Sequence, residues 1–256
     1  MDSLEAAIHA ARLAQGIHRY YQAKGFFTAS KTTITDLVTE ADRAAEEAIR
    51  GFLLEKFPDY GFLGEEEGEV AGGSGQPRWI VDPLDGTVNF AHGFPVYAVS
   101  IALEVEGRIE LGVVLDSARD ELYTAVRGQG ARLNGAPIRV STERDLRRSL
   151  LATGFPYDPS RIPEAVRYFE NVIQLGVPVR RPGAAALDLA FVAAGRLDGF
   201  WELKLNPWDV AAGWLLVEEA GGRVTGLKGE PYRLGNPYIV ATNGHLHAAL
   251  LERIAS

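Results

Sequence analysis

The sequence predicts an α/β (or α+β) protein in which layers of helices pack on β-sheets. Apolar residues recur at helical spacing in the first quarter of the chain, and strand and helix signals alternate through the second half. The chain has 256 residues, of which 46% are hydrophobic and 23% are charged. This length and composition allow a large buried core, in one domain or in two fused lobes.

The first quarter of the chain is predicted to hold two helices. Apolar residues from Leu4 to Ile17 lie at roughly helical spacing and predict a helix over residues 3–24. Thr39 is a candidate N-cap for a second helix, which we expect to run to about Lys56.

Short strands are predicted to follow. Residues 78–81 form an apolar strand candidate, and residues 121–126 form another. Between them, residues 97–105 and 108–115 flank the dipeptide 106–107 (Glu-Gly) and predict a β-hairpin.

A polar stretch with three arginines, from Ser141 to Arg148, is the candidate boundary between lobes covering residues 1–143 and 144–256. Strand and helix signals alternate beyond it, which favours helices layered on a sheet. The predicted elements are a strand at 149–153, helices at 163–175 and 185–194, a strand at 198–202, a helix at 208–220, strands at 222–225 and 238–241, and a helix at 245–254.

Composition excludes several classes of function. The formal net charge is −8 and the basic residues are scattered, so we expect no nucleic-acid partner. The chain has no cysteine, which excludes disulfides, thiolate catalysis and cysteine-ligated zinc. Neither a signal peptide nor a run of about 18 apolar residues is present. We therefore expect a cytoplasmic protein without a membrane partner.

The strongest chemical signal is residues 79–87 (WIVDPLDGT). An apolar strand leads directly into Asp82 and Asp85, whose carboxylates can point toward one place from the strand end. Pro83 stiffens the segment, and Gly86 allows close approach of a ligand. Clustered oxygen donors suit Mg²⁺. The alternative is an ordinary turn, because Asp-Pro and Asp-Gly are both common in turns.

Three further acids are candidates, each with a simpler explanation. Glu65 begins a run of three glutamates after a strand-like Phe-Leu-Gly, and such a run is more often a solvated surface. Asp209 lies in the first turn of a helix, where an acid stabilises the helix start. Asp42 is three residues after Thr39, which is the spacing of a capping box.

Taken together, these segments resemble the inositol monophosphatase family. The matching segments, in order and spacing, are residues 31–42, 64–66, 82–87, 207–213 and 221–222. The resemblance covers nearly the whole chain, and the Asp-Pro-Leu-Asp-Gly-Thr motif is highly specific. It implies a layered α-β-α-β-α sandwich of the inositol monophosphatase and fructose-1,6-bisphosphatase type. It also implies that residues 31–42 contain a mobile loop.

The resemblance implies a metal centre. Its ligands would be the side chains of Glu65, Asp82, Asp85 and Asp209 and the carbonyl oxygen of Leu84. The expected cofactor is Mg²⁺, about two or three ions per site, with Mn²⁺ as a substitute. Sensitivity to lithium is implied as well.

Catalytic and phosphate-binding roles follow from the same resemblance. Thr87, hydrogen-bonded to Asp42, would orient and deprotonate the attacking water, and Glu65 would assist. The backbone N–H groups of Gly86 and Thr87 would hold phosphate oxygens. None of the five histidines has metal-site spacing, so all five are expected at the surface or in packing.

The substrate contacts implied by the resemblance include a wall of Gly183, Ala184 and Ala185, with Glu202 binding ring hydroxyls. A plain charge on an edge strand is the alternative for Glu202. The implied contacts also include Asp85, Gly86, Thr87 and Asp209.

Some residues depart from the family pattern or stay open. Asn206 and Ala184 stand where animal members commonly carry His and Thr, and Lys204 stands where a small residue is frequent. These changes weaken any strict preference for inositol phosphate. Arg180 and Arg181 could contact substrate or a dimer partner, or lie in solvent.

The expected activity is hydrolysis of myo-inositol monophosphate, or of a related small sugar or polyol phosphate, by a homodimer. The alternative within enzymes is fructose-1,6-bisphosphatase activity, alone or combined with the first. Nucleotide 3′-phosphatase and histidinol phosphatase activities are weaker alternatives. The alternative outside enzymes is a regulatory binding partner in transcription or ribosome assembly.

Overall fold

The structure, a computed structural model, describes residues 1–30, 37–73 and 75–256. Its helices, apart from short 3-10 turns at Leu146–Arg148 and Pro159–Arg161, are α1 (Ser3–Lys24), α2 (Glu40–Lys56), α3 (Thr87–Ala91), α4 (Ile162–Ile173), α5 (Ala185–Ala193), α6 (Pro207–Glu219) and α7 (His247–Ala255). Within these residues, no helix combines the length and apolar character needed to cross a bilayer.

The strands form two large sheets and one small ribbon. The ribbon pairs β1 (Thr28–Ser30) with β2 (Leu37–Thr39). The first large sheet has the order β10 (Ala136–Ile138), β9 (Ala131–Leu133), β8 (Glu121–Val126), β7 (Arg108–Asp116), β6 (Ala98–Val105), β5 (Arg78–Asp85), β3 (Gly61–Gly64) and β4 (Glu69–Val70). The second has the order β12 (Val179–Arg180), β11 (Leu151–Thr153), β13 (Gly199–Leu203), β15 (Tyr238–Thr242) and β14 (Arg223–Thr225).

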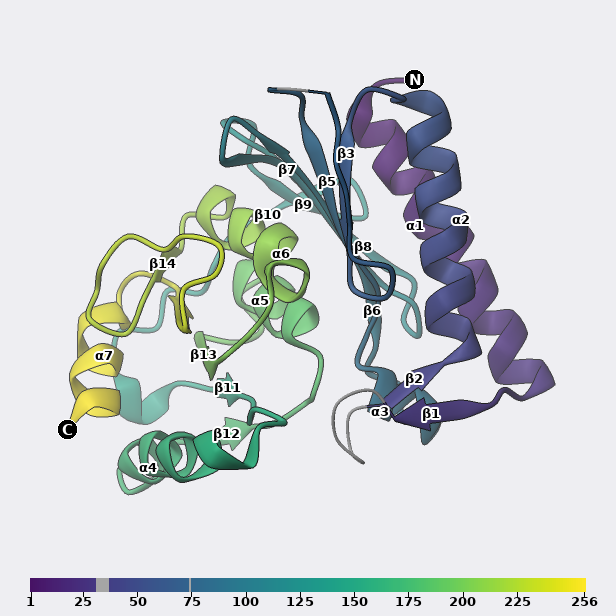
Figure 1. Ribbon diagram of the computed structural model, residues 1–256. Helices are drawn as coiled ribbons and strands as arrows, with labels where there is room; N and C mark the ends of the chain where they lie inside the picture. The colour runs from purple at the N-terminus through teal and green to yellow at the C-terminus, as the bar shows by residue number, and fades with distance from the viewer. Residues whose placement is uncertain (31–36, 74) are drawn as a thin grey trace.

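These elements stack in five layers (Figure 1). Helices α1 and α2 cover the outer face of the first sheet, and α5 and α6 lie between the two sheets. Helices α4 and α7 cover the outer side of the second sheet. The expected α-β-α-β-α sandwich is therefore confirmed.

Each interface between layers has its own apolar cluster. Alanines of α1 pack with Trp79 and Ile101 of the first sheet. The central cluster joins Ile80 to residues of α5 and α6 and to Phe200 of the second sheet. Because this central core includes residues from both sides of position 143, the division into lobes at 143 and 144 stays a prediction.

Most predicted elements agree with the structure to within two residues. The first helix has the predicted bounds, and α2 begins directly after its N-cap, Thr39, whose side chain accepts from two backbone N–H groups. The hairpin of β6 and β7 turns at Glu106 and Gly107, both with positive φ, as a tight hairpin requires. Strands β9, β10 and β12, with two or three residues each, had no sequence signal long enough to predict them.

The strand before the Asp motif is longer than predicted. We expected it to end at residue 81, but β5 continues to Asp85 because β6 extends alongside it. The register shifts between Asp82 and Asp85, where Pro83 cannot donate a ladder hydrogen bond. Asp82 and Asp85 therefore lie on an irregular strand end instead of a free turn.

Candidate active site

The end of β5 sets the direction of the two aspartates. Gly86 follows Asp85 at φ +89°, and a Cβ atom there would lie 2.8 Å from the carbonyl oxygen of Val96. Only glycine can adopt this backbone at so close an approach. The chain then turns into α3, and the end of β5 forms part of the wall of a cavity.

A cavity of about 110 Å³ lies beside this strand end. Its wall contains residues from the first sheet and from the segments around α5, β13 and α6. Every predicted site residue except Asp42 lines it: Glu65, Asp82, Leu84, Asp85, Gly86, Thr87, Gly183, Ala184, Ala185, Glu202 and Asp209. The fold thus brings together residues that are more than 140 positions apart in the chain, from Glu65 to Asp209.

Asp42 lies directly behind this wall, in the first turn of α2. One carboxylate oxygen, Oδ2, accepts from the backbone N–H of Thr39 at 2.8 Å and from its hydroxyl at 2.5 Å. The other, Oδ1, accepts from the Thr87 hydroxyl at 2.8 Å. Asp42 is therefore both the helix-capping residue and the expected partner of Thr87.

Burial raises the pKa of Asp42 to about 6, although its hydrogen bonds with Thr39 and Thr87 act in the opposite direction. The Thr87 oxygen also lies 3.0 Å from the carbonyl oxygen of Leu84. A hydroxyl has one proton, so Asp42 and Leu84 compete for it.

Backbone N–H groups donate hydrogen bonds to three acids in the cavity. The donors are the N–H of Leu84 to Asp82 (3.0 Å), of Ala186 to Asp85 (2.7 Å) and of Asn206 to Asp209 (2.7 Å). These bonds orient the carboxylates and leave other oxygen lone pairs for a ligand.

The same acids destabilise one another electrostatically. Burial, and next the charge of Glu65, hold the pKa values of Asp82 and Asp209 well above their usual range. Burial likewise raises the pKa of Asp85 to about 7, despite its backbone hydrogen bonds. Several carboxyl groups therefore share a space in which they cannot all ionise without a counter-charge.

The donor set suits a hard divalent cation, because it consists of carboxylate and carbonyl oxygens without sulfur or imidazole. In the described part of the chain, no three acidic or histidine side chains are already arranged around a single metal-sized point. The residues fit Mg²⁺ by their chemistry and charge.

Glu46 holds the glutamate segment in place and was not predicted. It is buried on α2 and accepts from the backbone N–H of Glu66 at 2.9 Å and of Glu67 at 2.7 Å. Its carboxylate lies directly against Gly64, where a Cβ atom would lie 2.5 Å from the Glu46 Oε2 atom. The available signal was its position four residues after Asp42, which places both acids on one helix face.

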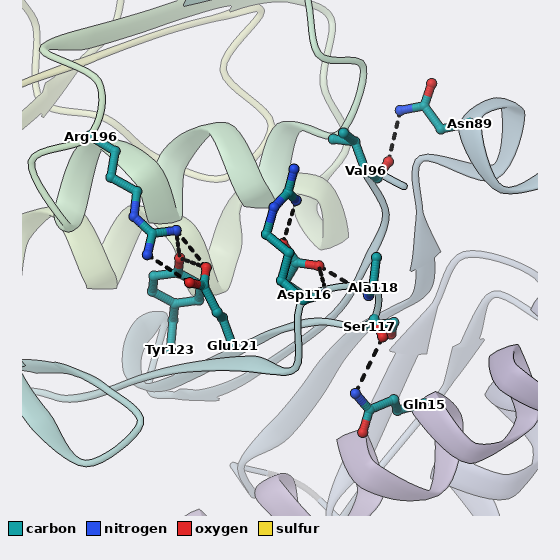
Figure 2. A network of polar contacts seen from close by, with 10 residues as sticks. Gln15, Asn89, Val96, Asp116, Ser117, Ala118, Glu121, Tyr123 and Arg196 are labelled. Carbon is teal, nitrogen blue, oxygen red and sulfur yellow. Dashed lines mark hydrogen bonds and ion pairs between the residues drawn. The ribbon is translucent and has the colours of Figure 1, made fainter. Parts of the chain in front are cut away.

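The substrate wall is attached to α3 by Asn89. Its side-chain amide donates to the carbonyl oxygen of Val96, as Figure 2 shows, and to that of Pro182, both at 2.8 Å. Gly183 follows at φ +83°, Ala184 is the N-cap of α5, and Ala185 is its first residue. One amide thus fixes the wall against the segment that follows the Asp motif.

Glu202 reaches the cavity from β13 and has a partly buried side chain. Its carboxylate lies against Gly154, where a Cβ atom would come within 2.1 Å. Burial raises the pKa of Glu202 to about 8, although the positive charge of Arg181 opposes this shift. Nearby, Asp188 is buried, and its Oδ1 atom has no hydrogen-bond partner among the described residues. Asp188 was not predicted.

The remaining predicted residues fall in different places. Arg181 lines the cavity, whereas Arg180 is exposed on β12. The predicted mobile loop includes residues 31–36, which lie outside the described residues.

Comparison with known proteins identifies a single protein family over nearly the whole chain. The model of the inositol monophosphatase family matches residues 2–256. The chain is 48% identical over 220 residues to an inositol-1-monophosphatase of Mesorhizobium japonicum, with 86% of this chain and 83% of that protein covered. It is 46% identical over 257 residues to Nus factor SuhB of Pseudomonas aeruginosa, with 98% and 95% covered.

A solved structure gives the same result for the fold. The extragenic suppressor protein SuhB of Bartonella henselae superposes with a TM-score of 0.93 at 43% identity. The superposition covers 98% of this chain and 97% of that one.

We predict that the metal-free protein loses stability as the pH rises from 7 to 9. The raised pKa values of Asp85 (about 7) and Glu202 (about 8) mean that the folded chain binds more protons than the unfolded chain. Raising the pH removes these protons and lowers the free energy of unfolding, by about 1–2 kcal/mol. The buried His18 and His247, with pKa values of about 4, have the opposite effect only at lower pH.

Thermal melts in excess EDTA at pH 7 and 9 measure this effect, which corresponds to about 2–4 °C in Tm for each kcal/mol. Saturating Mg²⁺ serves as the control and should reduce the difference. A Tm that stays constant or rises between pH 7 and 9 in EDTA would show that loss of protons from these acids does not destabilise the folded state.

Proposed function

The chain belongs to the inositol monophosphatase family, and on that premise we propose that it is a Mg²⁺-dependent phosphomonoesterase. The proposed substrate is myo-inositol monophosphate or a related small sugar or polyol phosphate. One observation carries this proposal. Glu65, Asp82, Asp85 and Asp209 line a single cavity, and the hydroxyl of Thr87 at its wall is hydrogen-bonded to Asp42.

In the proposed site, the four acids and the Leu84 carbonyl would hold Mg²⁺. When bound, the cation supplies activation of water, neutralisation of the phosphate and stabilisation of the leaving alkoxide. The chain contributes the positions of these groups, because each acid is set by a strand end, a helix start or a backbone hydrogen bond.

The pair of Thr87 and Asp42 is proposed to move the proton of the attacking water. The Thr87 oxygen accepts a hydrogen bond from that water while its own proton is donated to Oδ1 of Asp42. A pKa of about 6 makes Asp42 a suitable proton acceptor near neutral pH. Glu65 faces the same cavity and can orient the same water.

Binding of the phosphate is proposed to use the backbone where β5 turns into α3. The N–H groups of Gly86 and Thr87 lie at this turn, and N–H groups at a helix start attract phosphate oxygens. Gly86 lets the ligand approach the backbone without a side chain in the way.

The substrate class follows from the space beside the acids. A second hollow of about 370 Å³ shares Glu65, Glu202 and Asp209 with the first. Its lining combines acidic side chains with aromatic ones such as Tyr157 and Trp208, which suits a hydroxylated ring, and Glu202 can hydrogen-bond ring hydroxyls. Lys204 also lines this hollow, so fructose-1,6-bisphosphate remains the runner-up substrate.

A second candidate function is favoured by the names of close relatives. Proteins 44–46% identical to this chain over nearly its full length are named Nus factor SuhB, which points to a role in transcription. A protein that acted only as a binding partner would not need four acids around one cavity. We therefore propose that turnover is retained, whether or not such a partner exists. A homodimer also stays a prediction.

The function is tested by phosphate release from inositol-1-phosphate, fructose-1,6-bisphosphate, glycerol-2-phosphate and a nucleotide 3′-phosphate. We expect turnover of at least one of the first three with Mg²⁺ or Mn²⁺, loss of turnover in excess EDTA, and inhibition by lithium. No turnover with any substrate and metal would favour the role as a binding partner. Full turnover in EDTA after metal stripping would contradict the mechanism.

The substitution Asp85→Asn separates a cation site from a structural turn. Asn keeps nearly the same shape and can still accept from the N–H of Ala186, but it lacks the charge. Because the acids repel one another, we expect the metal-free variant to melt at the same or a higher temperature than the wild type. Its stabilisation by Mg²⁺ should be weaker, and its rate should be lower by orders of magnitude.

Melting curves over a Mg²⁺ titration, alongside phosphate release, measure all three effects. Asp59→Asn is the matched control, since Asp59 is exposed and remote from the cavity, and it should behave as the wild type. An Asp85→Asn variant with wild-type rate and metal response would remove Asp85 from the site.

Glu202→Leu is expected to raise the Michaelis constant by about 5–10-fold, the equivalent of one hydrogen bond to a substrate hydroxyl. The Mg²⁺ concentration for half-maximal activity should stay near that of the wild type. Glu202→Gln keeps hydrogen-bonding capacity and should have a smaller effect. Steady-state kinetics measure both, with Glu252→Gln on α7 as an exposed control. Equal Michaelis constants for Glu202→Leu and the wild type would leave Glu202 as a plain charge on its strand.

A further inference from the structure

The Pro83–Leu84 peptide, between the two aspartates of β5, needs hydrogen-bond partners from outside the sheet. β5 pairs with β6 at Asp82 and again at Asp85, and the register shifts between them. Pro83 lies in this interval and is buried, so its carbonyl oxygen requires a partner. That partner comes from α1, since Nε2 of His18 lies 3.0 Å from the Pro83 oxygen.

His18 is fully buried and has a partner at each ring nitrogen. A carbonyl oxygen can only accept, so Nε2 carries the proton and Nδ1 has the lone pair. The Ser117 hydroxyl, 2.9 Å from Nδ1, must therefore be the donor. Burial lowers the pKa of His18 to about 4, so the ring is neutral near pH 7. The two hydrogen bonds fix both its tautomer and its orientation.

Both backbone polar groups of Ser117 are hydrogen-bonded. Its N–H donates to the carbonyl oxygen of Tyr97 at 3.2 Å. Its own carbonyl oxygen accepts from the side chain of Gln15 at 3.4 Å, as Figure 2 shows. The ring of His18, which lies on α1, is thus held by the turn that follows β7.

The other end of the same peptide reaches the candidate metal site. The N–H of Leu84 donates to Oδ1 of Asp82 at 3.0 Å, while the C=O of Pro83 accepts from His18. A peptide unit is planar, so holding its carbonyl also sets the direction of its N–H. The orientation of the Asp82 carboxylate therefore depends on His18.

We propose that His18 is a positioning residue that locks the Pro83–Leu84 peptide and thereby orients Asp82 toward the bound cation. This inference rests on the proposed function, because it assigns Asp82 to the metal site. Without His18, the peptide can rotate and the carboxylate loses its fixed donor. The cation then has to organise its own ligand, and its affinity falls.

The test replaces His18 with Leu or Gln and measures Mg²⁺ binding in two ways. One is the Mg²⁺-dependent rise in Tm, which needs no turnover, and the other is the Mg²⁺ concentration for half-maximal phosphate release. For His18→Leu we expect both to indicate about 10-fold weaker Mg²⁺ binding, as found when groups that orient metal ligands are removed. The rate at saturating Mg²⁺ should change much less.

His18→Gln should restore Mg²⁺ affinity to within about twofold of the wild type, because its amide can donate to Pro83 and accept from Ser117. His247→Leu is the matched control. His247 is also buried with a partner at each ring nitrogen, Thr225 and Thr242, but it lies far from the motif in sequence, on α7. This control should lose stability without losing Mg²⁺ affinity.

The inference is overturned if His18→Leu binds Mg²⁺ as the wild type does, or if His247→Leu weakens Mg²⁺ binding equally. If His18→Leu does not fold, Ser117→Ala replaces it, and unchanged Mg²⁺ affinity in that variant overturns the inference. A wild-type protein with neither Mg²⁺ binding nor turnover would instead contradict the proposed function, which keeps the two failures distinct.

Discussion

Repulsion among buried carboxylates is the constraint on which the rest of the site depends. Asp82, Asp85 and Asp209 all have raised pKa values because they are shielded from solvent and lie near the charge of Glu65. Apolar residues at these positions would make the metal-free folded state more stable than the acids do. The surrounding layers hold the acids in position, and the proposed cation would supply the missing positive charge.

The layered fold explains how this arrangement is maintained. The strand end of β5 presents two acids, α6 presents Asp209 in its first turn, and the start of α5 donates the N–H of Ala186 to Asp85. Around them, Glu46, His18 and Asn89 each bind backbone groups of the segments that carry the site. The side chains facing the cavity are thus supported by a second set of polar residues, each of which hydrogen-bonds at least one backbone group of these segments.

The sequence predicted the helices other than α3 and about half of the strands, and the family resemblance supplied the acids of the cavity wall. Long amphipathic patterns gave α1 and α2 their correct ends, and the motif around Asp82 pointed to carboxylates meeting at one place. The extension of β5 to Asp85 was not predicted, because it depends on pairing with β6. Glu46 and His18 were missed for a related reason, since their partners lie about 20 and 65 residues further along the chain. Spacing within α2 places Glu46 on the same helix face as Asp42, but it does not identify partners so far along the chain.

We propose that acids from both halves of the chain form one divalent cation site. The most direct test of this proposal is a crystal structure of the protein grown with Mn²⁺, with anomalous scattering used to locate the metal. We expect an anomalous peak inside the cavity, about 2.0–2.5 Å from carboxylate oxygens of Asp82 and Asp85. A cavity without a peak at saturating Mn²⁺, or a peak only at other residues, would contradict it.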